Sequence, residues 1–346
     1  MKYRQLGRSG LKVSVLTMGT FTFGGVGPFA MVGNQGPKEA RRLVDVCMDA
    51  GVNLFDTANM YSYGRSEEIL GEVLDGRRDD VLISSKARMQ IGDGPNDGGV
   101  SRYHLIRECE RSLKRLRTDH IDIYYMHEWD GATPLDEMLE ALYTLQQQGK
   151  IRYAGCSNYS GWHIMKALGV SERRGLPRFV TQQIHYTLEA REAEYELLPI
   201  AVDQGLGVLV WSPIAGGLLS GKHRRGQEPP AGTRQAAGWS EPPIRDPERL
   251  WRIVDTLVEV GERHGVSAAR VALAWLLERP RITSLVVGGR TEEQFRDNLA
   301  AADLELTDED RTQLNEASAI PMLYPYWHQK NFAGDSFGPG DRALHG

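Results

Sequence analysis

Four residues whose side chains could move a proton stand at or near the ends of apolar runs. Asp56 ends the run 52–56, Tyr61 follows it five residues later on a polar turn, and Lys86 and His127 each end a later run. A free tyrosine, with a pKa of about 10, is a poor acid at neutral pH. A nearby ammonium lowers that pKa, an aspartate can hold the ammonium, and a histidine can orient a substrate oxygen. The residue types therefore indicate proton donation by a phenol.

Each of these residues alone also has a plain structural explanation. Asp56 and Lys86 could form an ordinary ion pair, and His127 could be a hydrogen-bonded core histidine. The four are chemically complementary, however, and the three strands that carry them are consecutive. We therefore favour chemistry over packing, provided that the fold brings these strand ends to one rim.

The elements that must position these residues repeat along the chain. Apolar, β-branched-rich runs predict eight strands, at 15–20, 52–56, 81–86, 121–127, 151–157, 179–186, 207–212 and 282–288. Amphipathic segments such as 37–50, 101–117 and 134–148 predict helices between them. This alternation indicates a parallel sheet covered by helices, either doubly wound or closed. Count and spacing favour the α/β class with a (β/α)8 TIM barrel, in which chemistry lies at the carboxyl ends of the strands.

We expect residues 1–346 to form one barrel domain. Three segments of this domain fall outside the strand and helix repeat. The stretch 3–13 predicts an N-terminal β-hairpin. The segment 221–246, after the seventh strand, has four prolines and four glycines without a clear period, so we expect a long loop that is a lid or is disordered. The segment 318–346 predicts a C-terminal loop or tail whose end could be mobile.

Composition restricts the partners. The formal net charge is −5 and charges of both signs are interleaved, so neither nucleic acid nor a membrane surface is expected. Cys47, Cys109 and Cys156 are odd in number and lack metal-type spacing, which suits a reducing compartment. The start has no apolar signal core. We expect a cytoplasmic protein with a small-molecule partner, with an oligomer possible.

A family resemblance becomes specific in the stretches around these residues. They are FDTANMYSYGRSEEILG, ISSK, IDIYYMHEWD, GKIRYAGCSNYS, VLVWSPIAGGLLSGK and VVGGRTEEQFRDNL. From about residue 3 to about residue 317 the chain resembles an aldo-keto reductase, and most closely the bacterial members that are similar to potassium-channel β-subunits. The resemblance implies a catalytic tetrad of Asp56, Tyr61, Lys86 and His127, in which the tyrosine is the general acid/base.

The resemblance also implies a nicotinamide dinucleotide cofactor, held without a Rossmann domain. Gly25, Gly27 and Ala30 match a dinucleotide fingerprint, but no helix is predicted to open there, so we reject that motif. The residues implied to bind the cofactor are Thr20, Phe21, Asp56, Ser157, Asn158, Gln183, Trp211, Ser212, Pro213, Ile214, Gly216, Leu218, Lys222, Arg234, Gly288, Arg290, Gln294 and Asn298. The loop 221–246 is then expected to cover the cofactor.

The residues themselves support the adenosine end of that site. Gly288 and Gly289 precede a predicted helix start, where backbone N–H groups and the helix dipole suit phosphate. Arg290, Gln294 and Asn298 then share one helical face, although simple solvation or a capping box at Thr291 and Gln294 also explains this spacing. Arg290 resembles the family position that meets the 2′-phosphate, which favours NADPH, with NADH possible.

The substrate pocket is expected to be aromatic. Its candidates are Phe21, Phe23, Met60, Tyr63, Trp129 and the cluster 324–327, although each could simply pack in a loop. Glu128, Trp129 and His185 depart from what is common in the family, and this bears on the identity of the substrate.

We therefore expect an NADPH-dependent oxidoreductase that reduces aldehydes or ketones. One alternative is a sugar or polyol dehydrogenase that runs the reverse reaction. Another is a redox-sensing module with little turnover, since potassium-channel β-subunits resemble this family and share the tryptophan at position 211. A metal-dependent hydrolase would need clustered histidine and aspartate ligands, which the predicted strand ends do not carry.

Overall fold

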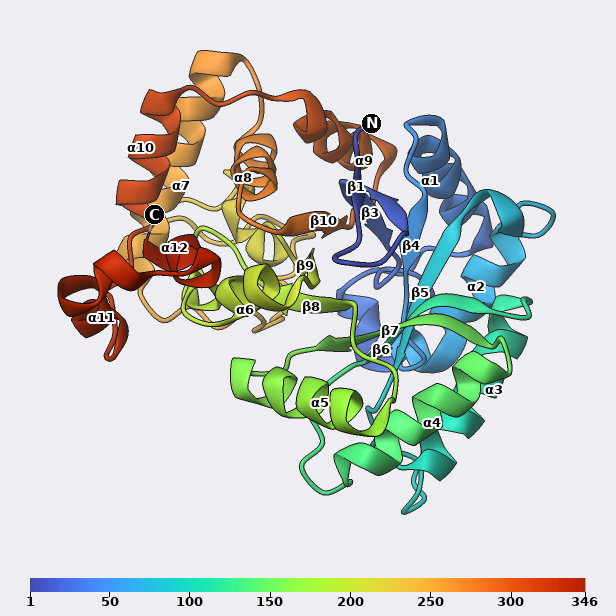
Figure 1. Ribbon diagram of the computed structural model, residues 1–346. Helices are drawn as coiled ribbons and strands as arrows, with labels where there is room; N and C mark the ends of the chain where they lie inside the picture. Colours follow the sequence, from blue (N-terminus) through green and yellow to red (C-terminus); the bar gives the residue numbers. More distant parts are fainter. Residues whose placement is uncertain (346) are drawn as a thin grey trace.

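A closed barrel of eight parallel strands forms the centre of the computed structural model, which describes residues 1–345 (Figure 1). The strand order around the barrel is β10-β3-β4-β5-β6-β7-β8-β9. The strands are β3 (Leu16–Gly19), β4 (Leu54–Asp56), β5 (Leu82–Ala87), β6 (Ile121–Met126), β7 (Ile151–Ser157), β8 (Thr181–His185), β9 (Gly207–Trp211) and β10 (Ile282–Val287). The predicted α/β class and the (β/α)8 TIM barrel are confirmed.

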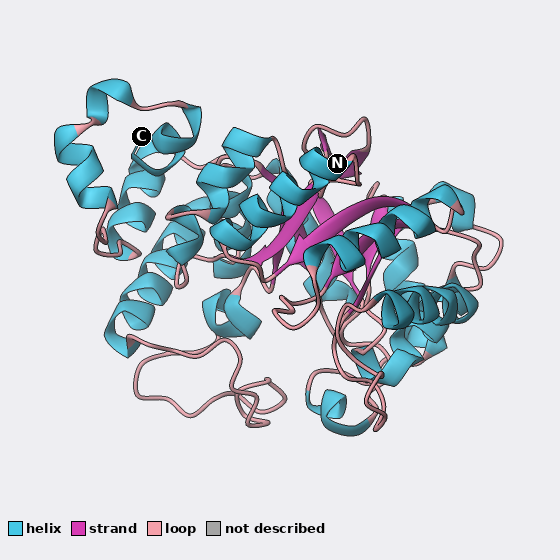
Figure 2. Cartoon of the chain, turned by 60° about the horizontal axis from the view of Figure 1, so that its bottom comes forward, coloured by secondary structure: helices cyan, strands magenta, loops and turns pink. Residues whose placement is uncertain are grey.

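Helices enclose the strands as an outer layer (Figure 2). Those that lie between consecutive barrel strands are α1 (Pro37–Asp49), α2 (Arg65–Val73), α3 (Arg102–Leu116), α4 (Leu135–Gln147), α5 (Gly161–Arg174), α6 (Leu197–Gln204), α7 (Pro247–His264) and α8 (Ala268–Leu277). After β10 come α9 (Glu292–Leu299), α10 (Asp308–Ala317), α11 (Tyr326–Phe332) and α12 (Pro339–His345). Capping side chains mark the first turns of several helices. At the start of α3, the Ser101 hydroxyl accepts a hydrogen bond from the backbone N–H of His104.

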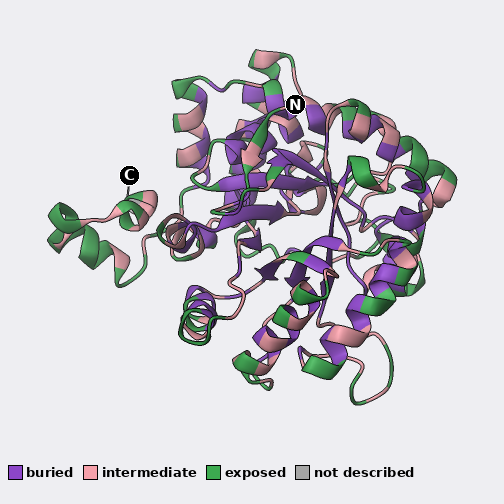
Figure 3. Cartoon of the chain, turned by 45° about the vertical axis from the view of Figure 1, so that its right-hand side comes forward, coloured by how far each residue is buried: buried purple, intermediate pink, exposed green. Residues whose placement is uncertain are grey.

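The core has an inner and an outer part. Inside the barrel, apolar side chains from several strands pack together, among them Leu54, Tyr125 and Leu209. Leu6 and Val13 join them from the predicted N-terminal hairpin, β1 (Tyr3–Gln5) and β2 (Lys12–Ser14), which is confirmed. Outside the barrel, the strands and the inner faces of the helices form the second part, and exposed residues lie on the outer helix faces (Figure 3). The hairpin thus fills the amino-terminal end of the barrel and leaves the carboxyl-terminal mouth for the site.

Strand register aligns the candidate residues at that mouth. Gly19 pairs with Asp56, and Asp56 pairs with Ser84. Since alternate residues of a strand share a face, Ser84 and Lys86 point to the same side. Asp56 and Lys86 are therefore brought into reach of each other by the sheet itself.

Two segments outside the barrel repeat differ in whether they contain helices. The loop 221–246 contains turns and bends but no helix or strand, as expected. The C-terminal segment, expected to be a loop or tail, instead contains α11 and α12, and α12 packs against α6 (Figure 1). A Cβ on Gly340 would lie 3.1 Å from the carbonyl oxygen of Pro199, so the backbone approaches α6 closely here. Within residues 1–345, no helix combines the length and apolar character needed to cross a membrane.

Candidate active site

The mouth of the barrel gathers the four residues predicted to carry the chemistry. Asp56 is the last residue of β4, Lys86 is the fifth of the six residues of β5, and His127 follows β6 directly. Tyr61 begins a short 3-10 helix, Tyr61–Gly64, that leads into α2. Ser62 inside this helix has a left-handed backbone with φ 49°, so the chain turns sharply just after the phenol.

The ammonium of Lys86 is the centre of the group. Its Nζ lies 2.6 Å from Asp56 Oδ2, 2.8 Å from the carbonyl oxygen of Thr57 and 3.4 Å from Tyr61 Oη. An ammonium has three donors, so these contacts use all of them. The second oxygen of Asp56 accepts from Ser84 at 2.6 Å and from Gln183 at 2.9 Å. The ion pair is thus buried and fully hydrogen-bonded.

Burial sets the direction of the tyrosine's titration. Burial raises the pKa of Tyr61 above its ordinary value. The positive charge of Lys86 lowers this pKa, but its effect is smaller than that of burial, and the charge of Asp56 raises the pKa further. Lys86 thus acts in the expected direction on the pKa of Tyr61, but burial outweighs it because a phenolate buried here loses its hydration. For Lys86, burial acts to lower the pKa, but the charges of Asp56 and Tyr61 outweigh it and raise the pKa. At neutral pH the pair is a phenol beside an ammonium.

His127 faces the same phenol. The two rings are 5.8 Å apart and inclined by 74°. Burial, with Lys86 as a second cause, lowers the pKa of His127 well below its usual range, so the imidazole is neutral at physiological pH. Its Nδ1 is buried without a hydrogen-bond partner among the described residues. A neutral ring with a free nitrogen suits hydrogen bonding to a substrate oxygen.

The residues implied to hold a carboxamide lie beside this group. Trp211 Nε1 donates to Asn158 Oδ1 at 3.0 Å, and Asn158 Nδ2 donates to the carbonyl oxygen of His127 at 3.1 Å. The Ser157 hydroxyl is buried and has no partner within residues 1–345. Because an unpaired buried hydroxyl is costly, this atom fits a ligand with both donor and acceptor groups, as a nicotinamide carboxamide has.

The segment after β9, which the resemblance assigns to the pyrophosphate, makes tight turns. Ser212, Ala215 and Gly216 have positive φ values of 50°, 49° and 64°, and the Ser212 hydroxyl accepts from the Gly216 N–H at 2.9 Å. The N–H groups of Ala215 and Gly217 also donate within the turn, to the carbonyl oxygens of Ser212 and Ile214. Around them Pro213 and Leu218 are buried, Ile214 is half-buried and Lys222 is exposed.

The predicted adenosine end contains two arginines that face the same region. Arg290 donates to the carbonyl oxygens of Met31 at 2.8 Å and Val32 at 2.9 Å, and also to that of Gly232 in the long loop. Arg234 lies over the ring of Phe21, 5.8 Å from its centroid. Burial, with the charge of Arg290 adding to it, lowers the pKa of Arg234 to about 10. The charge of Glu241 only partly offsets this lowering, and neither arginine forms an ion pair within residues 1–345, so the two cations suit an anion.

Other residues expected at the adenosine end of the site make hydrogen bonds within the protein. Gln294 Oε1 accepts from the backbone of Arg290 at 2.7 Å, and Asn298 Nδ2 donates to the Gly288 carbonyl oxygen at 3.3 Å. Thr291 caps α9. The Thr20 hydroxyl is buried and lies 3.1 Å from the carbonyl oxygen of Asp56. These contacts shape the loop, so a capping role accounts for part of the spacing seen in the sequence.

The long loop closes over this region. Gln235 Nε2 donates to the carbonyl oxygen of Gly216 at 3.2 Å. The ring of Trp239 lies 5.9 Å from that of Phe21, which is 4.8 Å from the ring of Tyr61. Trp239 was missed in the sequence, because only the path of the loop brings it to the mouth.

The side chains expected in the substrate pocket do not all lie beside Tyr61. Phe21 contacts Tyr61 directly, and Met60 is half-buried beside it. Phe23, expected in the pocket, is completely buried in the core between strands and helices. Trp129, also expected there, instead stacks on His163 of α5, with centroids 3.8 Å apart and planes within 10°. Phe23 is thus held by the core, and Trp129 by ring contacts with His163 and Tyr159.

A cavity of about 540 Å³ opens at the same end of the molecule. Asn158 and His185 line it, together with Pro242 of the long loop and Tyr326 of α11. Three carboxylates, Glu189, Glu192 and Glu196, also line it. Its wall thus runs from Asn158 to the C-terminal segment.

A buried network beneath the site was also missed. Ser85, next to Lys86, donates to Glu67 at 2.6 Å, and Arg115 donates to the other oxygen of Glu67 at 2.6 Å. Charged residues on helices usually predict solvated faces, so the sequence carried no signal for these contacts. Among residues 1–345, His, Cys, Asp and Glu side chains nowhere form a group of three or more that could hold a metal ion.

Comparison with known proteins agrees with this geometry. Residues 15–319 match the model of the aldo/keto reductase family. An uncharacterized oxidoreductase, YrpG, from Bacillus subtilis (strain 168) is 42% identical over 330 residues, covering 91% of this chain and 95% of its own. A probable voltage-gated potassium channel subunit beta from Oryza sativa subsp. japonica is 38% identical, covering 88% and 92%. A versiconal hemiacetal acetate reductase from Aspergillus parasiticus is 31% identical, covering 94% and 99%.

Proposed function

The chain belongs to the aldo/keto reductase family and is an oxidoreductase, and from this premise we propose that it reduces an aldehyde or ketone with NADPH, with Tyr61 as the proton donor. The observation that carries the proposal is the hydrogen-bonded path from Asp56 through Lys86 to the Tyr61 hydroxyl. That path lies in the mouth of the barrel and ends at a phenol whose pKa is raised by burial, so the acid is protonated at neutral pH.

The reaction assigns one role to each side chain. When bound, the reduced dinucleotide supplies the hydride that reaches the carbonyl carbon. Tyr61 gives its proton to the carbonyl oxygen, so the product is the alcohol and the tyrosine becomes a phenolate. Lys86, 3.4 Å from Tyr61 Oη, stabilises that phenolate, and Asp56 keeps the ammonium in place. The neutral ring of His127 orients the oxygen through its nitrogen. The same side chains serve the reverse reaction, in which an alcohol is oxidised.

The chain offers residues for each part of the cofactor. Ser157, Asn158 and Gln183 would bind the carboxamide, and Trp211 provides an aromatic face for the ring. The turns from Ser212 to Lys222 would follow the pyrophosphate. Arg234 and Arg290 would meet the 2′-phosphate, which is the reason to favour NADPH over NADH. The unpartnered Ser157 hydroxyl and the two neighbouring arginines support this assignment.

Steady-state consumption of NADPH with a panel of aldehydes and ketones tests the proposal. Tyr61→Phe should lower turnover by about 10²- to 10⁴-fold while NADPH still binds. Tyr143→Phe is the matched control, since Tyr143 is exposed on α4. Equal activity of Tyr61→Phe and the wild type would reject Tyr61 as the acid.

Two other functions make different predictions in the same assay. The similarity to a probable potassium channel subunit beta supports a redox-responsive binding module, for which the wild type should show no more turnover than Tyr61→Phe. A sugar or polyol dehydrogenase should show NADP reduction with alcohols that exceeds carbonyl reduction at matched cofactor levels. Loss of activity on chelation would instead indicate a metal-dependent reaction.

A further inference from the structure

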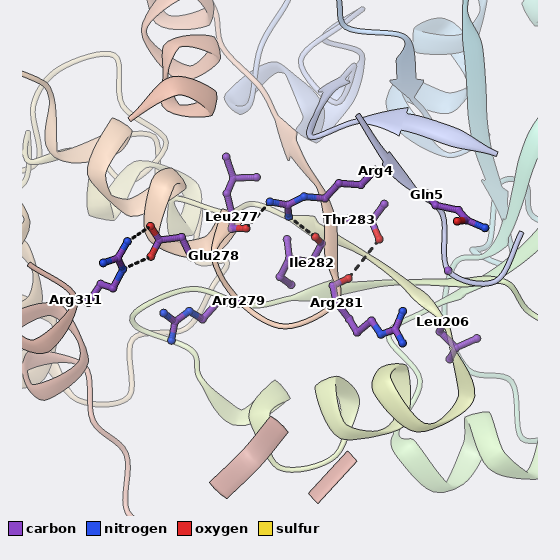
Figure 4. A pocket seen from close by; sticks show the side chains of 11 residues that line it. Arg4, Gln5, Leu206, Leu277, Glu278, Arg279, Arg281, Ile282, Thr283 and Arg311 are labelled. Atoms are coloured by element: carbon purple, nitrogen blue, oxygen red, sulfur yellow. Dashed lines mark hydrogen bonds and ion pairs between the residues drawn. The ribbon is translucent and has the colours of Figure 1, made fainter. Parts of the chain in front are cut away.

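A cavity of about 760 Å³ lies at the amino-terminal end of the barrel, and the proposed reaction does not use it (Figure 4). The hairpin, the turn before β9, the connection from α8 to β10, and α10 all contribute to its wall. Leu206 directly precedes β9 and Ile282 begins β10, so the cavity is where these strands enter the barrel. The tetrad lies at the opposite, carboxyl-terminal end.

The wall of this cavity is strongly basic. It contains Arg4, Arg279, Arg281 and Arg311 but only one acidic residue, Glu278. Arg311 already neutralises Glu278, because its Nε and Nη2 donate to the two carboxylate oxygens at 2.8 and 3.0 Å (Figure 4). Within residues 1–345 the other three arginines form no ion pair, so their charge is uncompensated.

Two of these guanidinium groups are held in place before any ligand arrives. Arg4 donates to the carbonyl oxygens of Ile282 at 2.5 Å and Leu277 at 2.8 Å. Arg279 lies 4.6 Å from the centroid of the Trp275 ring, and its Nε is buried without a partner among the described residues. A guanidinium has five N–H donors, so both groups keep donors for a ligand and lose little entropy on binding it.

We propose that this cavity binds a small molecule with two or more phosphoryl groups. Guanidinium groups match phosphate oxygens in bidentate geometry, and three uncompensated charges exceed what a single monoanion needs. The volume falls within the range of small-molecule sites and is larger than one phosphate requires. This site is independent of the cofactor, since its arginines lie at the other end of the barrel from Arg234 and Arg290.

Calorimetric titration with inorganic tripolyphosphate at low salt tests the proposal. Because Arg234 and Arg290 could also attract this anion, the titration is done in an Arg290→Ala background as well as in the wild type. Arg279→Gln with Arg281→Gln should weaken tripolyphosphate binding by about 10- to 100-fold in both backgrounds, and carbonyl reduction should be unchanged. Arg42→Gln with Arg174→Gln removes the same charge from exposed positions on α1 and α5 and should leave binding intact.

Two results would overturn the proposal. One is unchanged binding in the cavity variant, and the other is an equal loss in the charge-matched control, which would indicate general attraction only. If the double variant folds poorly, Arg281→Gln alone still tests the proposal, because Arg281 is exposed and accepts the hydrogen bond from Thr283 through its backbone carbonyl, which the substitution keeps. That single variant should still weaken binding measurably.

Discussion

The side-chain amide of Asn59 donates a 3.1 Å hydrogen bond to Glu108, a carboxylate with no exposed surface. The backbone N–H of Asn59 also donates to the carbonyl oxygen of Lys86 at 3.1 Å. The loop that carries Tyr61 is therefore attached to both α3 and β5. Since Asn59 touches no reacting atom, we assign it a positioning role.

Asn59→Ala should lower turnover more than it weakens NADPH binding. The substitution leaves an oxygen of buried Glu108 without this donor, which should reduce the free energy of unfolding by about 1–3 kcal/mol. Thermal unfolding and steady-state kinetics measure the two effects. Asn96→Ala, at an exposed position, is the matched control. A variant that loses stability but keeps its full kcat would show that the loop needs no support from Glu108.

The stability of the protein should fall at acid pH through His127. Its pKa is lower in the folded state, mainly because of burial, so the folded protein binds fewer protons than the unfolded chain below about pH 6.5. The contribution to stability is fully present above that pH and is lost as the pH falls. His127→Gln should reduce the change in unfolding free energy between about pH 8 and about pH 5 by up to about 2 kcal/mol.

Urea unfolding at the two pH values measures this difference. Other histidines whose pKa is lowered by burial, such as His104 and His185, contribute equally to both proteins and cancel. His328→Gln, at an exposed position on α11, should behave as the wild type. An equal pH dependence in the wild type and His127→Gln would mean that the pKa of His127 is the same in the folded and unfolded states.

The barrel and the meeting of Asp56, Lys86 and Tyr61 were predictable because they follow from local pattern. Strands and helices have different apolar periods, and strand ends in a barrel meet at one rim. The positions of Phe23 and Trp129 were not predictable. An aromatic residue near a strand end can turn into the mouth or away from it, and only the packing of distant segments decides which.

The same limit applies to the direction of the Tyr61 pKa and to the C-terminal segment. Residue types predicted the cation beside the phenol, but the degree of burial decides the net shift and is a property of the whole fold. The helix α12 follows a polar, glycine-rich stretch, and its support by α6 is a long-range contact. Long-range contacts leave no local signal in a single sequence.

The pair Lys86 and Tyr61 should make the protein sensitive to alkaline pH. Both pKa values are raised in the folded state, for Lys86 by Asp56 and Tyr61 against the effect of burial, and for Tyr61 by burial. Their contribution to stability is therefore fully present below about pH 10 and is lost as the pH rises through the folded-state values. Lys86→Met should flatten this alkaline dependence.

Lys86→Met should also lower stability by about 3–5 kcal/mol at neutral pH, since it leaves Asp56 buried without its cation. Turnover should fall because the phenolate formed on proton transfer loses its stabilising charge. Lys114→Met, at an exposed position on α3, is the control for both stability and turnover. Full activity of Lys86→Met would show that the phenol needs no neighbouring ammonium.

Arg290→Ala should weaken NADPH binding by about 10- to 100-fold and NADH binding much less, because only NADPH carries the 2′-phosphate. Arg290 also donates to Met31 and Val32, so the substitution could loosen the loops around the site. Such loosening affects both cofactors equally, and the ratio of the two dissociation constants separates the roles. Arg296→Ala, at an exposed position on α9, the helix that follows the Arg290 loop, should leave the ratio unchanged. Equal weakening of NADPH and NADH by Arg290→Ala would remove the basis for the cofactor preference and leave Arg290 as a link between loops.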